Sequence, residues 1–144
     1  MTTVTQSTLN ELWHLPGVKM AHETGSFVIC DPPVLNTDRD FVVYGRAAAR
    51  RSLEKAGFKK TSPSNDGYKS DSMTMFRRGD DNVIFTCKRK VYYAWVKATR
   101  LAAHMNLLDK KQRVLLFAYI VDGKYPNDMP FRPCPKQTAF LRQE

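Results

Sequence analysis

Hydrophobic residues in the second half of the chain recur at the spacing of an α-helix. Between residues 90 and 105 they follow one another at steps of four and three, so they share one face. Lys90, Lys97 and Arg100 fall on the other faces of the same segment. The apolar face consists of Val91, Trp95, Ala98, Ala102 and Met105. This pattern predicts an amphipathic helix that packs with one side against the rest of the protein.

The other predicted helices are marked by their ends. Residues 46–56 are rich in alanine and are followed by Gly57, the residue type most common just after a helix. Asp109, with a glutamine three residues later, has the spacing of a capping box and starts a last helix, which Gly123 ends. A short helix over residues 8–14 precedes a proline–glycine pair, which ends it.

Runs of β-branched and aromatic residues, bounded by turn residues, predict the strands. These runs cover residues 18–23, 38–44, 72–77 and 82–87. The last two are joined by Arg78-Gly79-Asp80-Asp81, whose glycine and aspartates are typical of a hairpin turn. The brief apolar run Phe27–Cys30 is stopped by two prolines, and residues 62–70 predict an exposed turn or loop.

This order of elements predicts an α+β fold, in which a small mixed β-sheet has helices packed on it. We expect one domain over residues 1–123, because 144 residues suit a single core. Residues 124–144 contain four prolines, which favour an extended tail over another helix or strand. The sequence leaves open whether this tail packs on the domain or binds a partner.

Composition and charge indicate the kind of protein, its partners and its location. The chain is 42% hydrophobic, as a folded domain is, and carries a formal net charge of +9. Such a charge favours polyanionic partners, although it also serves simply to keep a small protein soluble. No apolar run approaches the roughly 20 residues of a membrane span, and the first residues lack a secretory signal, so a cytoplasmic location is expected. Cys30, Cys87 and Cys134 have no zinc-ligand spacing and predict three reduced thiols.

The feature that points most directly to chemistry is Asp38-Arg39-Asp40. Successive side chains of a strand alternate between its faces, so Asp38 and Asp40 project together and Arg39 points away. Two carboxylates on one face repel each other, and a divalent cation such as Mg²⁺, which prefers oxygen ligands, would relieve that repulsion. The competing interpretation is that both are ordinary polar residues at the exposed start of a strand.

The context of the aspartates resembles the signature of the nucleotidyltransferase (polymerase beta-like) superfamily. Gly25-Ser26 closes the first predicted strand, a gap of eleven residues follows, and Asp38-Arg39-Asp40 leads into the apolar Phe41-Val42-Val43. With His22–Ser26, Cys30–Pro33 and Asn82–Thr86, the chain also resembles the small nucleotidyltransferase-like proteins of tailed bacteriophages over roughly residues 18–123. The resemblance implies a minimal nucleotidyltransferase-like fold, with Gly25 and Ser26 at the nucleotide phosphates and Asp38 and Asp40 on Mg²⁺ or Mn²⁺.

Two positions depart from the superfamily pattern. The residue between the aspartates is normally apolar, and Arg39 here suggests a face open to solvent or to a phosphate. Active members usually place a third carboxylate on a neighbouring strand, as a metal ligand or general base. If Asn82 holds that position, the general base is missing. Asp81, which we expect as the third ligand, and Asp80 are the alternatives.

Basic residues flank the predicted strand at 82–87. Arg77 and Arg78 precede it, and Lys88, Arg89 and Lys90 follow it, which predicts either a solvated face or a phosphate-binding surface for RNA or a triphosphate. Tyr92 and Tyr93 lie beside the second cluster, as in stacking platforms, whereas Trp95 belongs to the apolar stripe and is expected in the core.

These features lead to two hypotheses about function. The first is a metal-dependent nucleotidyltransferase that transfers a nucleoside monophosphate from a nucleoside triphosphate to an RNA, a protein or a small hydroxylated acceptor. The second is a catalytically degenerate protein of the same fold, phage-type, that binds nucleic acid or a host protein and modulates it. The shortness of the chain also favours a partner or a homo-oligomer. A membrane partner is not expected.

Overall fold

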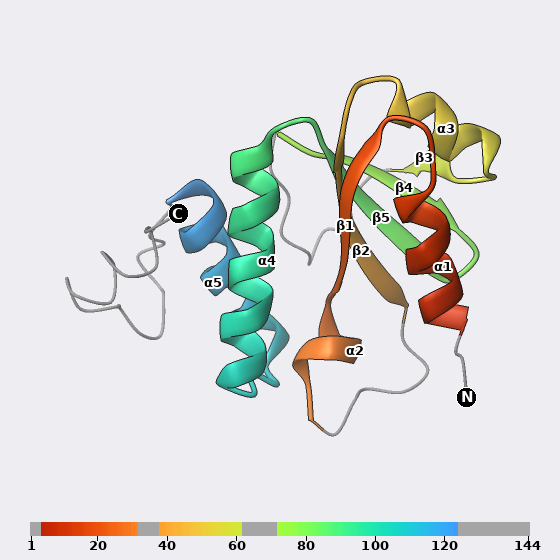
Figure 1. Cartoon of the computed structure of the whole chain (residues 1–144). Coiled ribbons are helices and arrows are strands. Elements are labelled where there is room, and N and C mark those ends of the chain that lie inside the picture. Colours follow the sequence, from red (N-terminus) through yellow and green to blue (C-terminus); the bar gives the residue numbers. More distant parts are fainter. Residues whose placement is uncertain (1–3, 32–37, 62–71, 124–144) are drawn as a thin grey trace.

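A five-stranded mixed sheet forms the centre of the computed structural model, which describes residues 4–31, 38–61 and 72–123 (Figure 1). Helices cover both faces of this sheet, so the predicted α+β class is confirmed. The helices are α1 Val4–Trp13, α2 Ser26–Ile29, α3 Ala49–Lys55, α4 Arg89–His104 and α5 Lys110–Asp122. The strands are β1 Val18–Thr24, β2 Arg39–Gly45, β3 Lys59–Thr61, β4 Thr74–Arg78 and β5 Asp81–Thr86.

The strands lie in the order β1-β2-β5-β4-β3, and only β2 and β5 run parallel to each other among the described strands. In that central pair Asp40 is opposite Asn82 and Tyr44 is opposite Thr86. Strand β1 pairs with β2 antiparallel, and Thr24 at its end is opposite Asp40. The ends of β1, β2 and β5 are thereby brought together, although they lie far apart in the sequence.

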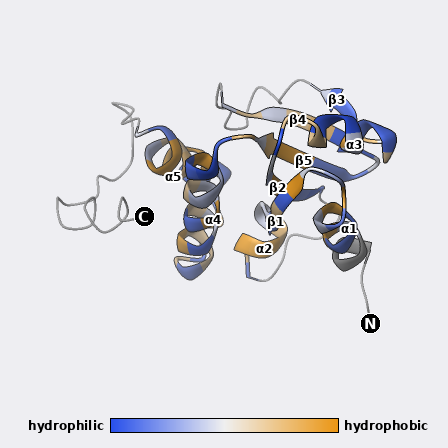
Figure 2. Ribbon diagram, turned by 45° about the horizontal axis from the view of Figure 1, so that its top comes forward, coloured by the Kyte–Doolittle hydropathy of each residue, from blue (hydrophilic) through white to orange (hydrophobic). Residues whose placement is uncertain are grey.

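The two faces of the sheet carry separate cores. Val42 and Ile84 point to the face that is covered by α2, α4 and α5, which we call the site face. Their neighbours Phe41, Val43 and Val83 point to the opposite face, under α1 and α3. This alternation follows from the two-residue repeat of a strand. Figure 2 shows the hydrophobic character of β5 between the two helical layers.

Two elements were not predicted, and their sequences explain why. The run after Gly25 forms α2, a helix of four residues, which is too short for a periodic pattern. Strand β3 is exposed along its whole length and exists through its pairing with β4. The alanine-rich helix is shorter than expected, because Arg46 donates its backbone N–H to Gly17 O and precedes a turn.

The ends of α5 agree with the sequence. Asp109 Oδ1 accepts hydrogen bonds from the backbone N–H of Lys111 at 2.8 Å and of Gln112 at 3.4 Å, and Gly123 ends the helix in the left-handed conformation. Cys30 is buried and Cys87 exposed, both as free thiols. The predicted loop at 62–70, the tail at 124–144 and Cys134 lie outside the described residues. Among the described helices, none has the length and apolar character needed to span a bilayer.

Candidate functional site

Asp38 and Asp40, the acidic pair, lie together on the site face, at the end where β2 begins. The side-chain amide of Asn82 on β5 connects them, because Nδ2 donates to Asp40 Oδ1 at 3.1 Å and approaches Asp38 Oδ2 at 3.4 Å. The register of the parallel strands explains this arrangement, since Asp40 and Asn82 are direct neighbours on the same face. Asn82 therefore holds the position on the adjacent strand that faces the acidic pair.

A guanidinium group completes the cluster. Arg77 on β4 binds Asp38 through both terminal nitrogens, at 2.9 Å from Nη1 to Oδ2 and 3.2 Å from Nη2 to Oδ1. Its Nη1 also donates to Asn82 Oδ1 at 3.2 Å, which fixes the direction in which the asparagine amide points. Such a two-bond pair is the favoured geometry between arginine and a carboxylate. It is partly exposed, with 41% of the Arg77 and 43% of the Asp38 side chain accessible, so solvent weakens it.

Gly25 stands directly beside the acidic pair. Its φ of 86° lies in the left-handed region, and a Cβ added there would overlap Oδ2 of Asp40. Ser26 follows as the first residue of α2, so Gly25 lies against Asp40 and Ser26 is the next residue along the chain.

A buried hydrogen-bond network holds the preceding residue in place. Trp95 Nε1 donates to Thr24 Oγ1 at 3.1 Å, and the hydroxyls of Thr24 and Thr99 are 2.6 Å apart. Thr99 in turn donates to the Trp95 carbonyl oxygen at 2.9 Å, which leaves its own oxygen free to accept from Thr24. Each polar group of this network finds a partner, and the end of β1 is tied to α4 next to Gly25.

The two carboxylates of the acidic pair have pKa values shifted in opposite directions. Burial raises the pKa of Asp40 to about 6, partly offset by the Asn82 hydrogen bond, and the nearby charge of Asp38 raises it further. The hydrogen bonds from Arg77 lower the pKa of Asp38, against a smaller effect of burial. At neutral pH both groups are ionised, but only Asp38 has a full countercharge in contact.

Replacing Asp40 with asparagine is expected to stabilise the protein at pH 7. The ordinary pKa of 3.8 rises to about 6 in the folded state, so the buried charge costs on the order of 3 kcal/mol at neutral pH. As the pH falls from 7 towards 4, the folded wild type binds a proton more readily than the unfolded chain, and it gains stability. The advantage of Asp40→Asn should therefore shrink across this range in urea melts. Asp80→Asn, at an exposed residue, is the control. A stability advantage of Asp40→Asn that does not change with pH would contradict the raised pKa of Asp40.

Asp81 does not lie with the acidic pair. It is opposite Arg39 in the register, on the other face of the sheet, where its Oδ2 accepts a hydrogen bond from Thr8 Oγ1 at 2.9 Å. Adjacent strand residues point to opposite faces, so a residue next to Asn82 cannot take its place. Asp80 is in the turn, 3.7 Å from Arg77 Nη2. The expectation that Asp81 completes a ligand set with Asp38 and Asp40 is not met by this geometry.

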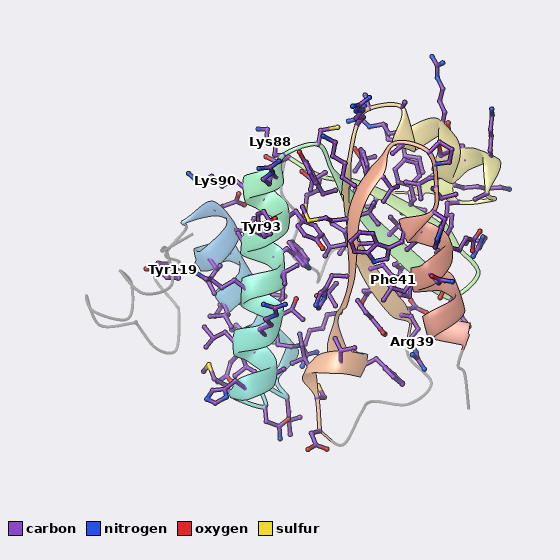
Figure 3. All side chains as sticks on the ribbon, in the orientation of Figure 1. Arg39, Phe41, Lys88, Lys90, Tyr93 and Tyr119 are labelled. Carbon is purple, nitrogen blue, oxygen red and sulfur yellow. The ribbon has the colours of Figure 1, made fainter. Side chains whose placement is uncertain are left out.

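Arg39 also points away from the acidic pair. Its guanidinium lies 3.1 Å from the centre of the Phe27 ring and 3.6 Å from a carboxylate oxygen of Glu23 (its position is labelled in Figure 3). Burial raises the pKa of Glu23 to about 6, with the charge of Arg39 acting in the opposite direction. Arg39 thus neutralises a partly buried acid, and its predicted role at a nucleotide phosphate has no support in the contacts.

The five basic residues proposed for nucleic acid divide between different environments. Arg78 donates to both carboxylate oxygens of Glu11, at 2.9 and 2.7 Å, and to the Ala56 carbonyl oxygen, so it ties α1 to the sheet. Arg77 belongs to the acidic cluster. The others, Lys88, Arg89 and Lys90, are exposed at the opposite end of β5. Of the neighbouring aromatic residues, Tyr92 and Trp95 are buried and Tyr93 is 40% exposed.

Asp38 and Asp40 are the residues of this site that could hold a divalent cation. Asp38 and Asp40 offer carboxylate oxygens, which suit Mg²⁺ or Mn²⁺ together with phosphate oxygens of a substrate. The described residues contain no cluster of three or more His, Cys, Asp and Glu side chains able to hold a metal. A cation between the acidic pair would also have to compete with Arg77 for Asp38.

Comparisons with known proteins add little to this geometry. No protein-family model matches the chain, and a search of curated proteins finds no significant match. A similar solved structure is the crystal structure of conserved protein GrpB from Enterococcus faecalis, with 14% sequence identity and a TM-score of 0.43. The match covers 81% of this chain and 86% of that one. A likeness at this level carries no conclusion about function.

Proposed function

We propose that the chain is a catalytically degenerate protein of the nucleotidyltransferase type, which binds a nucleoside triphosphate but does not transfer its nucleotide. The observation that carries this proposal is the amide of Asn82 between Asp38 and Asp40. An amide cannot draw the proton from an acceptor hydroxyl, so this position supplies no general base.

Arg77 supports the same conclusion. The guanidinium of Arg77 and the amide of Asn82 stabilise the negative charge of the acidic pair, which is the role of the divalent metal ions in two-metal catalysis. Two-metal catalysis needs ions about 3.5–4 Å apart that stabilise the attacking and leaving oxygens, and a third carboxylate commonly helps to hold them. In this proposal the two carboxylates hold one Mg²⁺ or Mn²⁺ that arrives with the triphosphate, and Gly25 and Ser26, beside Asp40, contact its phosphates.

The experiment measures binding and transfer separately. Binding of fluorescent nucleoside triphosphates with Mg²⁺ or Mn²⁺ should weaken at least tenfold in Asp38→Asn/Asp40→Asn. The control Asp80→Asn/Asp81→Asn removes the same charge from neighbouring residues and should bind as wild type does. With each α-labelled triphosphate and total RNA and protein, the wild type should transfer no label.

Either of two results would overturn the proposal. Label transferred by the wild type, but not by Asp38→Asn/Asp40→Asn, would establish a nucleotidyltransferase and identify its RNA, protein or small-molecule acceptor. Nucleotide binding that is equally strong in both double variants, from protein shown to be folded by circular dichroism, would remove the acidic pair from the binding site.

A further inference from the structure

Positive charge collects at the end of the sheet opposite the acidic pair and along α4, which runs back from that end. Strand β1 begins there and β2 and β5 end there, because Val18 is opposite Gly45 and Tyr44 is opposite Thr86. Residues 15–20, 44–52 and 86–101, which form this end and lead into α3 and along α4, contain no aspartate or glutamate. We call their cations the basic edge: Lys19, Arg46, Arg50, Arg51, Lys88, Arg89, Lys90, Lys97 and Arg100.

Most of the basic edge faces solvent. Lys97 is half-buried, and the other eight cations are exposed. Arg39, Arg77 and Arg78 form ion pairs with acidic residues at the other end of the sheet. Two acids belong to adjoining helices, Glu54 on α3 and Asp122 at the end of α5. Figure 2 shows the hydrophilic connection from β5 into α4, and Figure 3 shows Lys88 and Lys90 at one end of the molecule and Arg39 at the other.

The position of Lys88, Arg89 and Lys90 is not explained by the stability of the helix. They occupy the start of α4, a helix of 16 residues, where the helix dipole already places positive potential. Cations at this position are unfavourable, by roughly 0.3–1 kcal/mol each by the usual scale of the dipole effect. A bound anion would gain from both the side chains and the dipole.

An exposed aromatic ring lies among these basic residues. Tyr93 follows Lys90 by three residues and precedes Lys97 by four, so the three share one side of α4. Figure 3 labels Lys90 and Tyr93 on this helix. Its ring packs edge-on against Tyr92, at 5.6 Å between ring centres, and its hydroxyl lies 3.6 Å from the sulfur of Met20. These contacts hold the ring in place while 40% of the residue stays accessible.

We propose that the basic edge binds single-stranded nucleic acid, with phosphates along Lys88, Arg89 and Lys90 and a base stacked on Tyr93. A held aromatic ring between cations is the arrangement that binds unpaired bases without reading their sequence. A duplex offers no free base face to the ring, so single strands are preferred. This inference goes beyond the proposed function, because it concerns the other end of the sheet and does not depend on the chemistry of the acidic pair.

The test is the salt dependence of oligonucleotide binding, measured by fluorescence anisotropy. Labelled oligouridine and oligothymidine of about twelve nucleotides should bind more tightly than a duplex of equal length. In Lys88→Ala/Arg89→Ala/Lys90→Ala, affinity at about 50 mM salt should fall at least tenfold. The slope of log affinity against log salt should fall by about 2, since each phosphate contact contributes roughly 0.7.

Variants of Tyr93 separate stacking from charge. Tyr93→Ala should weaken binding by about tenfold with an unchanged salt slope, while Tyr93→Phe keeps the ring and should bind as wild type does. The charge control is Lys55→Ala/Lys59→Ala/Lys60→Ala, which removes three exposed cations from α3 and β3. Equal losses in the two triple variants, tighter binding of the duplex, or no binding at about 50 mM salt would overturn the proposal.

Discussion

Gly25→Ala should be among the most destabilising single substitutions in the described part of the chain. Two costs combine: the backbone at φ 86° disfavours any side chain, and the added Cβ would overlap Asp40 Oδ2 and lie 3.0 Å from its Cβ and Cγ. We expect a loss of about 3 kcal/mol in the free energy of unfolding. For a domain of this size, that lowers the melting temperature by about 10 °C.

The chain offers a matched control for this prediction. Gly79 also has a positive φ, 60°, but a Cβ added there meets nothing within 4 Å. Gly79→Ala should therefore show the conformational cost alone, about 1 kcal/mol. In a double-mutant cycle, Asp40→Ala should recover part of the loss caused by Gly25→Ala, since the carboxylate is what the methyl group meets. Equal losses of stability in Gly25→Ala and Gly79→Ala would show that Asp40 moves away from the added methyl group without an energetic cost.

The two-residue repeat of a strand is sufficient to predict which side chains of β2 and β5 face the site. Alternation along β2 placed Asp38 and Asp40 together, and the same rule applied to β5 set Asn82 apart from Val83. Asp81 is adjacent to Asn82 in the sequence, and because adjacent strand residues point to opposite faces, it lies away from the acidic pair.

The hairpin register of β4 and β5 is enough to place Arg77 beside Asn82. The turn at Gly79-Asp80 has two residues, which pairs Arg78 with Asp81 and Arg77 with Asn82 in a hairpin. That register puts Arg77 on the site face and Arg78 on the other, although the sequence presents them as one basic pair. The contact of β5 with β2, in contrast, joins segments about forty residues apart, and no local pattern predicts it.

Asn82→Asp should convert the acidic pair into a site that binds divalent cations at least ten times more tightly. The new carboxylate would face Asp40, where the amide now donates at 3.1 Å. Without metal, three carboxylates would share one countercharge from Arg77, and we expect a loss of about 2 kcal/mol in stability. Mn²⁺ should restore it, because a ligand bound only to the folded state stabilises by about 2.7 kcal/mol at a hundred times its dissociation constant.

Melting temperatures measured against Mn²⁺ concentration test this expectation, with Asn82→Ala as the control that removes the amide without adding charge. Asn82→Ala should be destabilised and should show no greater response to Mn²⁺ than the wild type. Asp38→Asn in the Asn82→Asp background should abolish the gain, because only two carboxylates then remain. If Asn82→Asp responds to Mn²⁺ as the wild type does, Arg77 and not the missing carboxylate limits metal binding. The variant to make next would then be Arg77→Gln, which keeps a hydrogen-bond donor near Asp38 and removes the competing charge.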